Sequence, residues 1–561
     1  MNNALYRKKI VPLLVRLCFP AVLVMVLSTS PMPAHAQNAA PDITPEKVAR
    51  AIAALKQYGM THKDAFSPPG TAVAIVYRDK PVAILVDGVL KMGQPEKING
   101  DTTFQLASVS KPLGATVMAK LLGMGLKWKD RGEQGVVSWD TPIQKLMPGF
   151  MVDQAVVTDN VSSRITLGNL YSHRSGLPDH AGDDLEDLGY GRLEVFKRLR
   201  YIPGVGKNFN AREYAYTNFG LTAAGFAAAS AAGMSWEVAS DSLLYKPAGM
   251  RNTTSTYANF VENPNHAYGH VLRNGKWVFE EQRQPDAQSP AGGASSSAND
   301  MAQWMRLYLA DGKLNGKQIV PAEALRELYS ANIDVSDKEK QAAKTDTSCD
   351  NIARYVYGWN ACRNGASVRI SHSGAFMMGA STVVVMLPNE KLGIVVLTNG
   401  EPYGVAETLA RGFLEAVQDD HLDAQKRFTE LFAEMKQVMD KELRGPHKGV
   451  INPSGCTIHD YSGIKTDRYT GTYANDYFGS FKVASEKGQL WMLQGPMENH
   501  RYSLNPCASN AQNGFEFYYR TKGENAVGNA IVQFSADTPD AAADKMDVPY
   551  LTVGEFKRAD R

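Results

Sequence analysis

Apolar, strand-like runs stand at both ends of a long helical stretch, and this arrangement constrains the fold more than any other feature of the sequence. Thr71–Tyr77 and Val82–Val86 flank a polar turn near the start, and Ser381–Leu387 and Gly393–Thr398 flank the turn Pro388–Lys391 near the end. Helical patterns are expected between and after them, at 111–125, 219–233, 301–310 and 405–417. A sheet that gathers strands from both ends of such a stretch belongs to the α+β class.

The pattern changes after residue 466. An amphipathic helix over Phe428–Leu443 has to stop at Gly445-Pro446. Short alternating runs then follow one another, separated by Gly, Asn and Asp. This spacing predicts a small all-β domain, either an open sheet or a barrel. We therefore expect a main domain at 37–427, a helix and linker at 428–465, and a β domain at 466–561.

The first 36 residues have the three-part layout of a secretory signal peptide. Arg7, Lys8 and Lys9 precede an apolar run that continues to Leu27, and Ala34-His35-Ala36 is a small-x-small cleavage site. The alternative is a membrane anchor, but Arg16 interrupts the run and leaves about ten apolar residues, against about 20 in a spanning helix. We expect cleavage after Ala36 and a mature chain in the periplasm or the medium.

Charge and cysteine content agree with that destination. The chain has 60 Lys and Arg against 58 Asp and Glu. Removing the four basic residues of the signal segment leaves 56 against 58, which gives no support for a nucleic-acid binder. Cys349, Cys362, Cys456 and Cys507 remain, and pairs 349–362 and 456–507 are favoured because each stays inside one expected domain. Four buried thiols are the alternative.

The first pattern with catalytic meaning is Ser-x-x-Lys, which occurs at Ser108/Lys111 and at Ser462/Lys465. Only Ser108 opens an apolar helical stretch, and positions i and i+3 of a helix share a face. A serine hydroxyl becomes a nucleophile when a nearby base takes its proton, and a lysine whose pKa is lowered by burial can do so. Ser108 and Lys111 are therefore the candidate nucleophile and base.

Two further patterns each occur three times. Tyr-x-Asn is found at Tyr216/Asn218, Tyr257/Asn259 and Tyr473/Asn475, and His-x-Gly at His180/Gly182, His372/Gly374 and His447/Gly449. Only Tyr216 and Asn218 precede a Gly-spaced apolar helix, where the phenol can relay a proton and the amide can hold a carbonyl and Lys111. Only His372 follows a strand-like run, at 366–370, and Gly374 there would let a substrate lie along the strand edge. The N–H groups of Ala375 and Ser108 could then face an oxyanion.

In this order the three patterns resemble those of the serine β-lactamase and penicillin-binding-protein superfamily, and in particular its branch of class C β-lactamases, class VIII esterases and D-aminopeptidases. The likeness runs over about residues 68–415. It includes FQLASVSK (104–111), ITLGNLYSHRSGLPD (165–179), PAGMRNTT (247–254) and AGGASSSANDMAQW (291–304).

The resemblance implies a β-lactamase/DD-peptidase-like fold, an antiparallel sheet flanked by an all-helical region, with the small β domain as an appended part. It further implies that Ser108 is acylated, that Lys111 and Tyr216 act as base and proton shuttle in an order left open, and that water releases the product. Asn218 would hold the substrate amide, and Ser108 and Ala375 would form the oxyanion hole. No metal, cofactor or nucleic-acid partner is implied.

One departure from the family pattern concerns the substrate. β-Lactamases carry Lys-Thr-Gly at the third pattern, and that tripeptide occurs nowhere in this chain. His372 stands in place of the lysine, and an imidazole of ordinary pKa is mostly neutral at pH 7. A neutral side chain there argues against efficient turnover of a β-lactam. His-x-Gly is found in the D-aminopeptidases and related peptidases and esterases of the superfamily, so the resemblance implies cleavage of a small peptide or amino-acid amide, including those with D-residues. Alternatives are a short-chain ester, a β-lactam, or a penicillin-binding protein that acylates without turnover.

Overall fold

The structure is a computed structural model that describes residues 42–559 except 62–63, 131, 153–160, 204–212, 332, 334–353, 365–366, 445–449, 452–460, 462, 499, 508–515, 521–528 and 537–540. The expected signal peptide, Cys349, Cys456 and Ser462 lie outside these residues. Within them, no helix is both long and apolar enough to cross a membrane.

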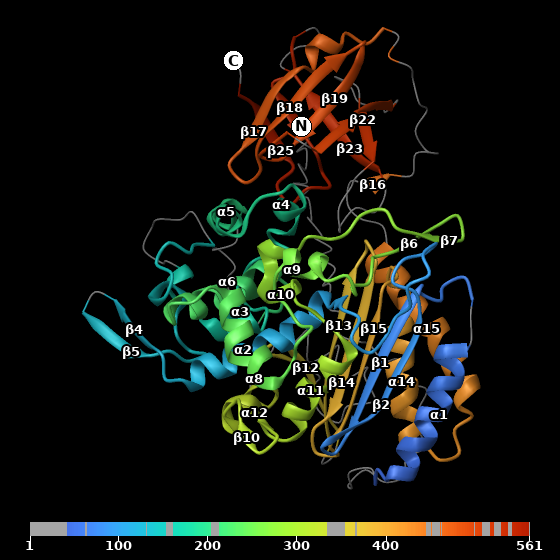
Figure 1. Cartoon of the computed structure of the whole chain (residues 1–561). Coiled ribbons are helices and arrows are strands. Elements are labelled where there is room, and N and C mark those ends of the chain that lie inside the picture. Colours follow the sequence, from blue (N-terminus) through green and yellow to red (C-terminus); the bar gives the residue numbers. More distant parts are fainter. Residues whose placement is uncertain are drawn as a thin grey trace, which may run out of the picture.

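A seven-stranded antiparallel sheet gathers segments from both ends of the main part of the chain (Figure 1). Its order is β11 (Arg354–Val356), β12 (Trp359–Asn364), β13 (Ser367–Phe376), β14 (Ala380–Leu387), β15 (Leu392–Thr398), β1 (Gly70–Tyr77) and β2 (Lys80–Gly88). The first and last of the expected hairpins meet where β1 pairs with β15, with Thr71 opposite Thr398. The α+β prediction is confirmed, and the strand expected to end at residue 370 continues through His372 to Phe376.

Both faces of this sheet are covered, which explains why β1, β14 and β15 are buried along their whole length. On one face lie α1 (Pro45–Thr61), α14 (Val405–Gln418) and α15 (Ala424–Arg444), the last of which contains the expected helix 428–443 (Figure 1). On the other face α11 (Ala298–Leu309) contacts β1 and β15, and the helical region lies beyond it.

The helical region is built around two buried helices that start beside each other, α2 (Ser110–Gly123) and α6 (Asn218–Ala231). Glycines let both helices approach the indole of Trp236. A Cβ on Gly114 or on Gly225 would lie 3.1 or 3.0 Å from that ring. Since close packing leaves little freedom to shift, the first turns of α2 and α6 are held in fixed positions. Those turns carry Lys111 and Asn218.

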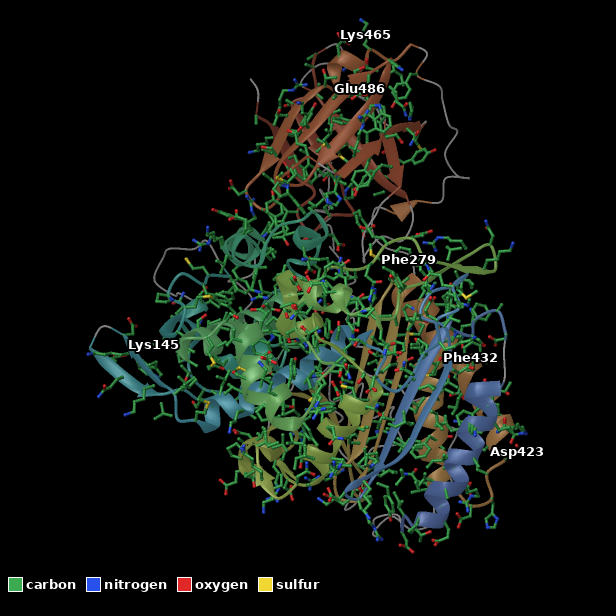
Figure 2. The ribbon with its side chains drawn as sticks, in the orientation of Figure 1. Lys145, Phe279, Asp423, Phe432, Lys465 and Glu486 are labelled. Carbon is green, nitrogen blue, oxygen red and sulfur yellow. The ribbon has the colours of Figure 1, made fainter. Side chains whose placement is uncertain are left out.

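The C-terminal part is an all-β, barrel-like sheet of ten strands that lies over α4 (Asp183–Asp187) and α5 (Arg192–Arg198) (Figure 1). Its order is β20 (His500–Ser503), β19 (Gln489–Gln494), β18 (Gly479–Glu486), β17 (Gly471–Asn475), β25 (Glu555–Arg558), β24 (Lys545–Asp547), β23 (Asn529–Ser535), β22 (Glu516–Arg520) and β21 (Asn505–Cys507), with β16 (Val450–Ile451) on β23. In Figure 2, Lys465 and Glu486 mark its distant end, whereas Phe279 lies near its junction with the rest of the chain.

Cys362 and Cys507 are both disulfide-bonded, which excludes four free thiols. The predicted pairing with Cys349 and Cys456 involves residues that the structure does not describe, and it stays a prediction. The domain boundaries at residues 36, 427 and 465 also stay predictions.

Candidate active site

Ser108 lies in a tight turn between the seven-stranded sheet and the helical region. It belongs to a 3-10 turn, Ala107–Val109, which precedes α2 rather than forming its first turn. Ala107 has a φ of 47°, a left-handed conformation that a non-glycine residue seldom adopts. The Thr382 hydroxyl of β14 donates to the Leu106 carbonyl at 2.7 Å and anchors the turn. Ser108 is thus held at a sharp corner with its side chain partly exposed.

The Lys111 ammonium lies one helical turn further on and is fully buried. Its Nζ donates to Ser108 Oγ at 2.9 Å, to Asn218 Oδ1 at 2.6 Å and to the Ala291 carbonyl at 3.1 Å. Burial lowers the pKa of Lys111 to about 7, against an opposing effect of the Asp183 charge. Near neutral pH a substantial fraction of this side chain is therefore the free amine, which can accept a proton.

The Tyr216 hydroxyl completes a triangle with these two groups. It lies 2.7 Å from Ser108 Oγ, and Lys111 Nζ is 4.6 Å from the centre of its ring. Burial raises the pKa of Tyr216 above its usual value, so the phenol keeps its proton. The backbone is fixed from both sides, since Tyr216 N donates to Asp179 Oδ1 at 2.6 Å and its carbonyl accepts from His180 N at 2.7 Å.

Asp183 and His180 join this group although they were not among the predicted site residues. Asn218 Nδ2 donates to Asp183 Oδ2 at 2.8 Å, and the same oxygen lies 2.8 Å from His180 Nδ1. Desolvation lowers the pKa of His180, but the hydrogen bond and charge of Asp183 outweigh it, and the pKa is raised. The His180/Gly182 pattern does not follow a strand-like run, and nothing in its spacing indicates that the next residue, Asp183, binds both His180 and Asn218.

His372 is buried and uncharged. Its Nδ1 lies 2.6 Å from the Ser373 carbonyl, which can only accept, so Nδ1 carries the proton. Nε2 then accepts from the Tyr355 hydroxyl at 3.0 Å. Burial, with the nearby Lys111 charge, lowers the pKa of His372 to about 3. The imidazole is therefore neutral even at pH values well below 7, where a histidine of ordinary pKa would be protonated.

Gly374 lies two residues beyond His372 on β13, against the turn Ala107–Val109, which carries the candidate nucleophile and is called the nucleophile turn below. A Cβ at this position would be 2.3 Å from the Leu106 carbonyl, 2.5 Å from Thr382 Oγ1 and 2.9 Å from Ser108 N. No side chain fits there, so strand and turn can touch only because this residue is glycine. Ala375 follows, partly exposed and opposite Ser381 of β14. The seven predicted residues thus come from one compact region where β13, α2 and the start of α6 meet.

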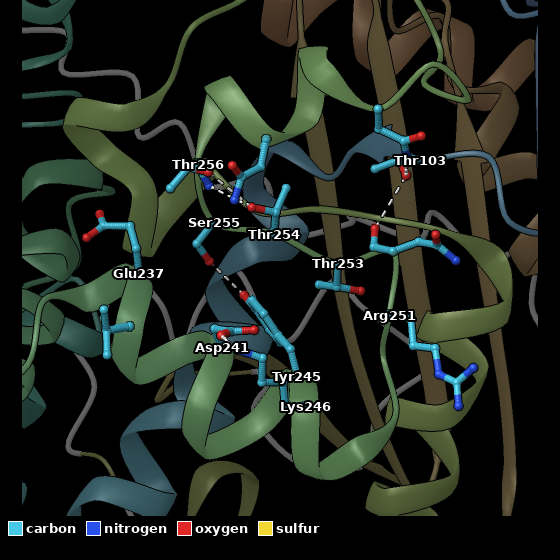
Figure 3. A pocket seen from close by; sticks show the side chains of 14 residues that line it. Thr103, Glu237, Asp241, Tyr245, Lys246, Arg251, Thr253, Thr254, Ser255 and Thr256 are labelled. Atoms are coloured by element: carbon cyan, nitrogen blue, oxygen red, sulfur yellow. Dashed lines mark hydrogen bonds and ion pairs between the residues drawn. The ribbon is translucent and has the colours of Figure 1, made fainter.

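A cavity of about 570 Å³ lies elsewhere in the helical region (Figure 3). Its lining is polar and includes Glu237, Asp241 and Arg251, and the Tyr245 hydroxyl there bonds Ser255 at 2.8 Å. Asn259, from one of the alternative Tyr-x-Asn matches, also lines it. None of the residues around Ser108 does, so this cavity is separate from the candidate site.

A serine between a buried lysine and a tyrosine, at the junction of an antiparallel sheet and a helical region, is an arrangement in which the serine hydroxyl can be activated as a nucleophile. The Beta-lactamase family model matches residues 61–418, and the chain belongs to this family of serine hydrolases. It is 26% identical to penicillin-binding protein 4 of Amycolatopsis lactamdurans (59% of this chain, 81% of that protein) and 24% identical to a β-lactamase of Escherichia coli K12 (59% and 84%).

Solved structures agree on the fold. The octameric penicillin-binding protein homologue from Pyrococcus abyssi matches with a TM-score of 0.53 at 17% identity, covering 91% of this chain and 99% of that one. Because this coverage extends past the family-model match, the likeness includes the C-terminal all-β part.

Proposed function

We propose that this chain is an exported serine hydrolase that cleaves the amide bond of a small peptide or amino-acid amide, including those with D-residues, through an acyl-enzyme on Ser108. The observation that carries the proposal is the convergence on Ser108 Oγ of Lys111 Nζ at 2.9 Å and the Tyr216 hydroxyl at 2.7 Å. Family membership supports the reaction class.

In the proposed reaction Ser108 Oγ attacks the substrate carbonyl carbon and gives its proton to the Lys111 amine, directly or through Tyr216. The carbonyl oxygen becomes negative and is held by the N–H groups of Ser108 and Ala375. The C–N bond then breaks, and the departing nitrogen receives the proton by the same route. Water attacks the ester on Ser108, a proton returns to Oγ, and the acid leaves.

Neutral His372 supports an amide without a nearby carboxylate as the substrate. A family member with lysine at this position has a permanent cation for a carboxylate, whereas this imidazole has both nitrogens engaged, by Ser373 and Tyr355. The same observation favours a short-chain ester as the second candidate and makes a β-lactam the third. A protein that acylates without turnover is the candidate of another class, in keeping with the name of the Amycolatopsis relative.

A substrate panel tests the proposal. The mature chain should release more than one equivalent of product per protein from p-nitroanilides of L- or D-amino acids, at higher kcat/KM than from nitrocefin. Ser108→Ala should abolish this release and labelling by a fluorophosphonate probe, while Ser462, in the other Ser-x-x-Lys match, offers a control in Ser462→Ala. A single burst without steady state would indicate the non-hydrolytic alternative, and full activity of Ser108→Ala would refute the mechanism.

A further inference from the structure

The C-terminal sheet reaches the hydrolase part through the turn between β17 and β18. Two neighbouring aromatic residues at this turn are both fully buried but in different surroundings. The Phe478 ring packs on Phe481 and Phe556 of its own sheet, with ring centres 5.7 and 5.9 Å apart. The Tyr477 hydroxyl instead contacts Gly182 and Asp184 of the hydrolase part. Tyr477 is therefore the side chain that this sheet contributes to the other half of the molecule at this point.

The contacts of Tyr477 lie on either side of Asp183, which accepts a hydrogen bond from the Asn218 amide nitrogen. Gly182 N donates to the Tyr477 hydroxyl at 3.0 Å, and the hydroxyl donates to Asp184 Oδ1 at 2.8 Å. A second contact from the C-terminal part, from Thr552 N, reaches Asp184 Oδ2 at 3.3 Å. Between Gly182 and Asp184 lies Asp183, whose Oδ2 accepts from Asn218 at 2.8 Å.

Helix α4, whose first residue is Asp183, is held by tertiary contacts at both ends, and at its other end Glu186 and Asp187 form ion pairs with Arg283. Helix α4 is only five residues long, and Gly182 before it has a φ of 95°. Gly182 also packs directly against the Phe219 ring. A Cβ on residue 182 would lie 2.8 Å from that ring, so there is room only for glycine. Because a short helix gains little from its own hydrogen bonds, its position depends on tertiary contacts. Tyr477 supplies such contacts on both sides of Asp183.

Other bonds attach the same turn without touching this segment. The Tyr190 hydroxyl donates to the Phe478 carbonyl at 2.6 Å. Arg198 Nη1 donates to the Asp476 and Tyr477 carbonyls at 3.1 and 2.9 Å. These residues hold the C-terminal sheet in place, so attachment of the sheet and support of Asp183 are carried by different side chains and can be separated by substitution.

We propose that Tyr477 of the C-terminal sheet is a positioning residue for the Ser108 site, which acts through Asp183 to keep the Asn218 amide oriented toward Lys111. The inference rests on the proposed function. Asn218 gives its oxygen to Lys111 at 2.6 Å and its nitrogen to Asp183. Displacement of Asp183 would free the amide to rotate and would remove one acceptor from Lys111. Because the geometry of reacting groups controls rate more than binding, the loss should fall on kcat.

The test compares two phenol-to-phenyl substitutions in the full chain. Tyr477→Phe leaves Gly182 N and Asp184 without this partner, whereas Tyr190→Phe removes a buried interdomain hydroxyl that bonds only the turn. We expect Tyr477→Phe to lower kcat for p-nitrophenyl acetate and the rate of fluorophosphonate labelling about tenfold, with KM within twofold. Tyr190→Phe should lower the thermal midpoint of unfolding about as much as Tyr477→Phe does, but it should keep kcat within twofold of the wild-type value. Equal kcat in the two variants would overturn the proposal.

A double-mutant cycle tests the route through Asp183. In an Asp183→Asn background, which already weakens the link to Asn218 and His180, Tyr477→Phe should cost less than twofold in kcat. A full further tenfold loss would mean that Tyr477 acts by another route and would overturn the proposal. If Tyr477→Phe is insoluble, Asp184→Asn is used in its place, with a loss of about threefold expected and an unchanged kcat overturning the proposal.

The two proposals fail in distinguishable ways. A folded wild-type chain that neither hydrolyses the ester nor reacts with the fluorophosphonate would refute the proposed function and the positioning role together. A wild-type chain that reacts, with Tyr477→Phe reacting at the same rate, would refute the positioning role alone.

Discussion

At the scale of single residues, the lowered pKa of Lys111 sets the expected pH dependence. Below pH 7 the ammonium predominates and cannot accept the proton of Ser108, so activity is lost as the pH falls. We expect kcat/KM for a neutral ester to rise about tenfold per pH unit up to about pH 7 and then to level off. A profile that is flat between pH 5 and 9 would contradict a catalytic role of the lysine amine.

A substitution of Asp183 tests whether the acid limb of this pH profile belongs to Lys111. The negative charge of Asp183 raises the pKa of Lys111 against the effect of burial. Asp183→Asn removes the charge and keeps the shape, so the acid limb of the profile should move to lower pH even as kcat falls. Movement to higher pH would show that the limb belongs to another group.

His372 provides the prediction on substrate charge. His372→Lys introduces a cation at the strand edge, and we expect at least about a tenfold gain in kcat/KM for nitrocefin, which carries a carboxylate, relative to p-nitrophenyl acetate. His372→Gln is the neutral control and should not change this ratio. An unchanged ratio in His372→Lys would mean that residue 372 does not face the substrate carboxylate.

At the scale of elements, the contact between β13 and the nucleophile turn depends on Gly374. Gly374→Ala would place a Cβ within 2.9 Å of three atoms, two of them backbone atoms, so strand and turn must separate. We expect a loss of at least 100-fold in kcat, measured with the best substrate of the panel. Gly393→Ala on β15 is the control, because the three atoms nearest to its Cβ would be side-chain atoms of Met305, Met386 and Leu309, at 3.1 Å or more, and these side chains can move.

Comparison of sequence and structure at this scale shows what local patterns can predict. Both hairpins of the sheet and the helices that bear Lys111 and Asn218 were predictable, because the spacing of apolar residues along the chain follows which side of a strand or helix is buried. Asp183 and His180 were not, since a polar side chain in a loop or a single-turn helix shows no periodicity, and the partner of Asp183, Asn218, is distant in sequence. Tyr477 was equally hidden: its neighbour Tyr473 matched a pattern, yet Tyr473 bonds Tyr469 inside its own sheet.

At the scale of the whole molecule, the two sheets each contain one described disulfide cysteine, Cys362 on β12 and Cys507 on β21. A disulfide in a folded domain typically contributes about 2–4 kcal/mol. With the predicted pairs 349–362 and 456–507, Cys507→Ser should lower the unfolding midpoint of the C-terminal sheet, and Cys362→Ser that of the larger part, as followed by calorimetry. Reducing agent should reproduce both shifts, and midpoints insensitive to it would contradict the expectation.

The pairing of β1 with β15 also bears on how the molecule is made. Strand β1 is translated early, yet its second neighbour, β15, does not exist until Thr398 has left the ribosome. Contacts so distant along the chain close slowly, because the entropy of the intervening loop is lost before the strands gain anything from pairing. The nucleophile turn rests on β13 and β14, which also come late. Nascent chains that stop short of these strands would carry Ser108 without the contacts that fix its turn, so the proposed nucleophile would be positioned only once the sheet can close.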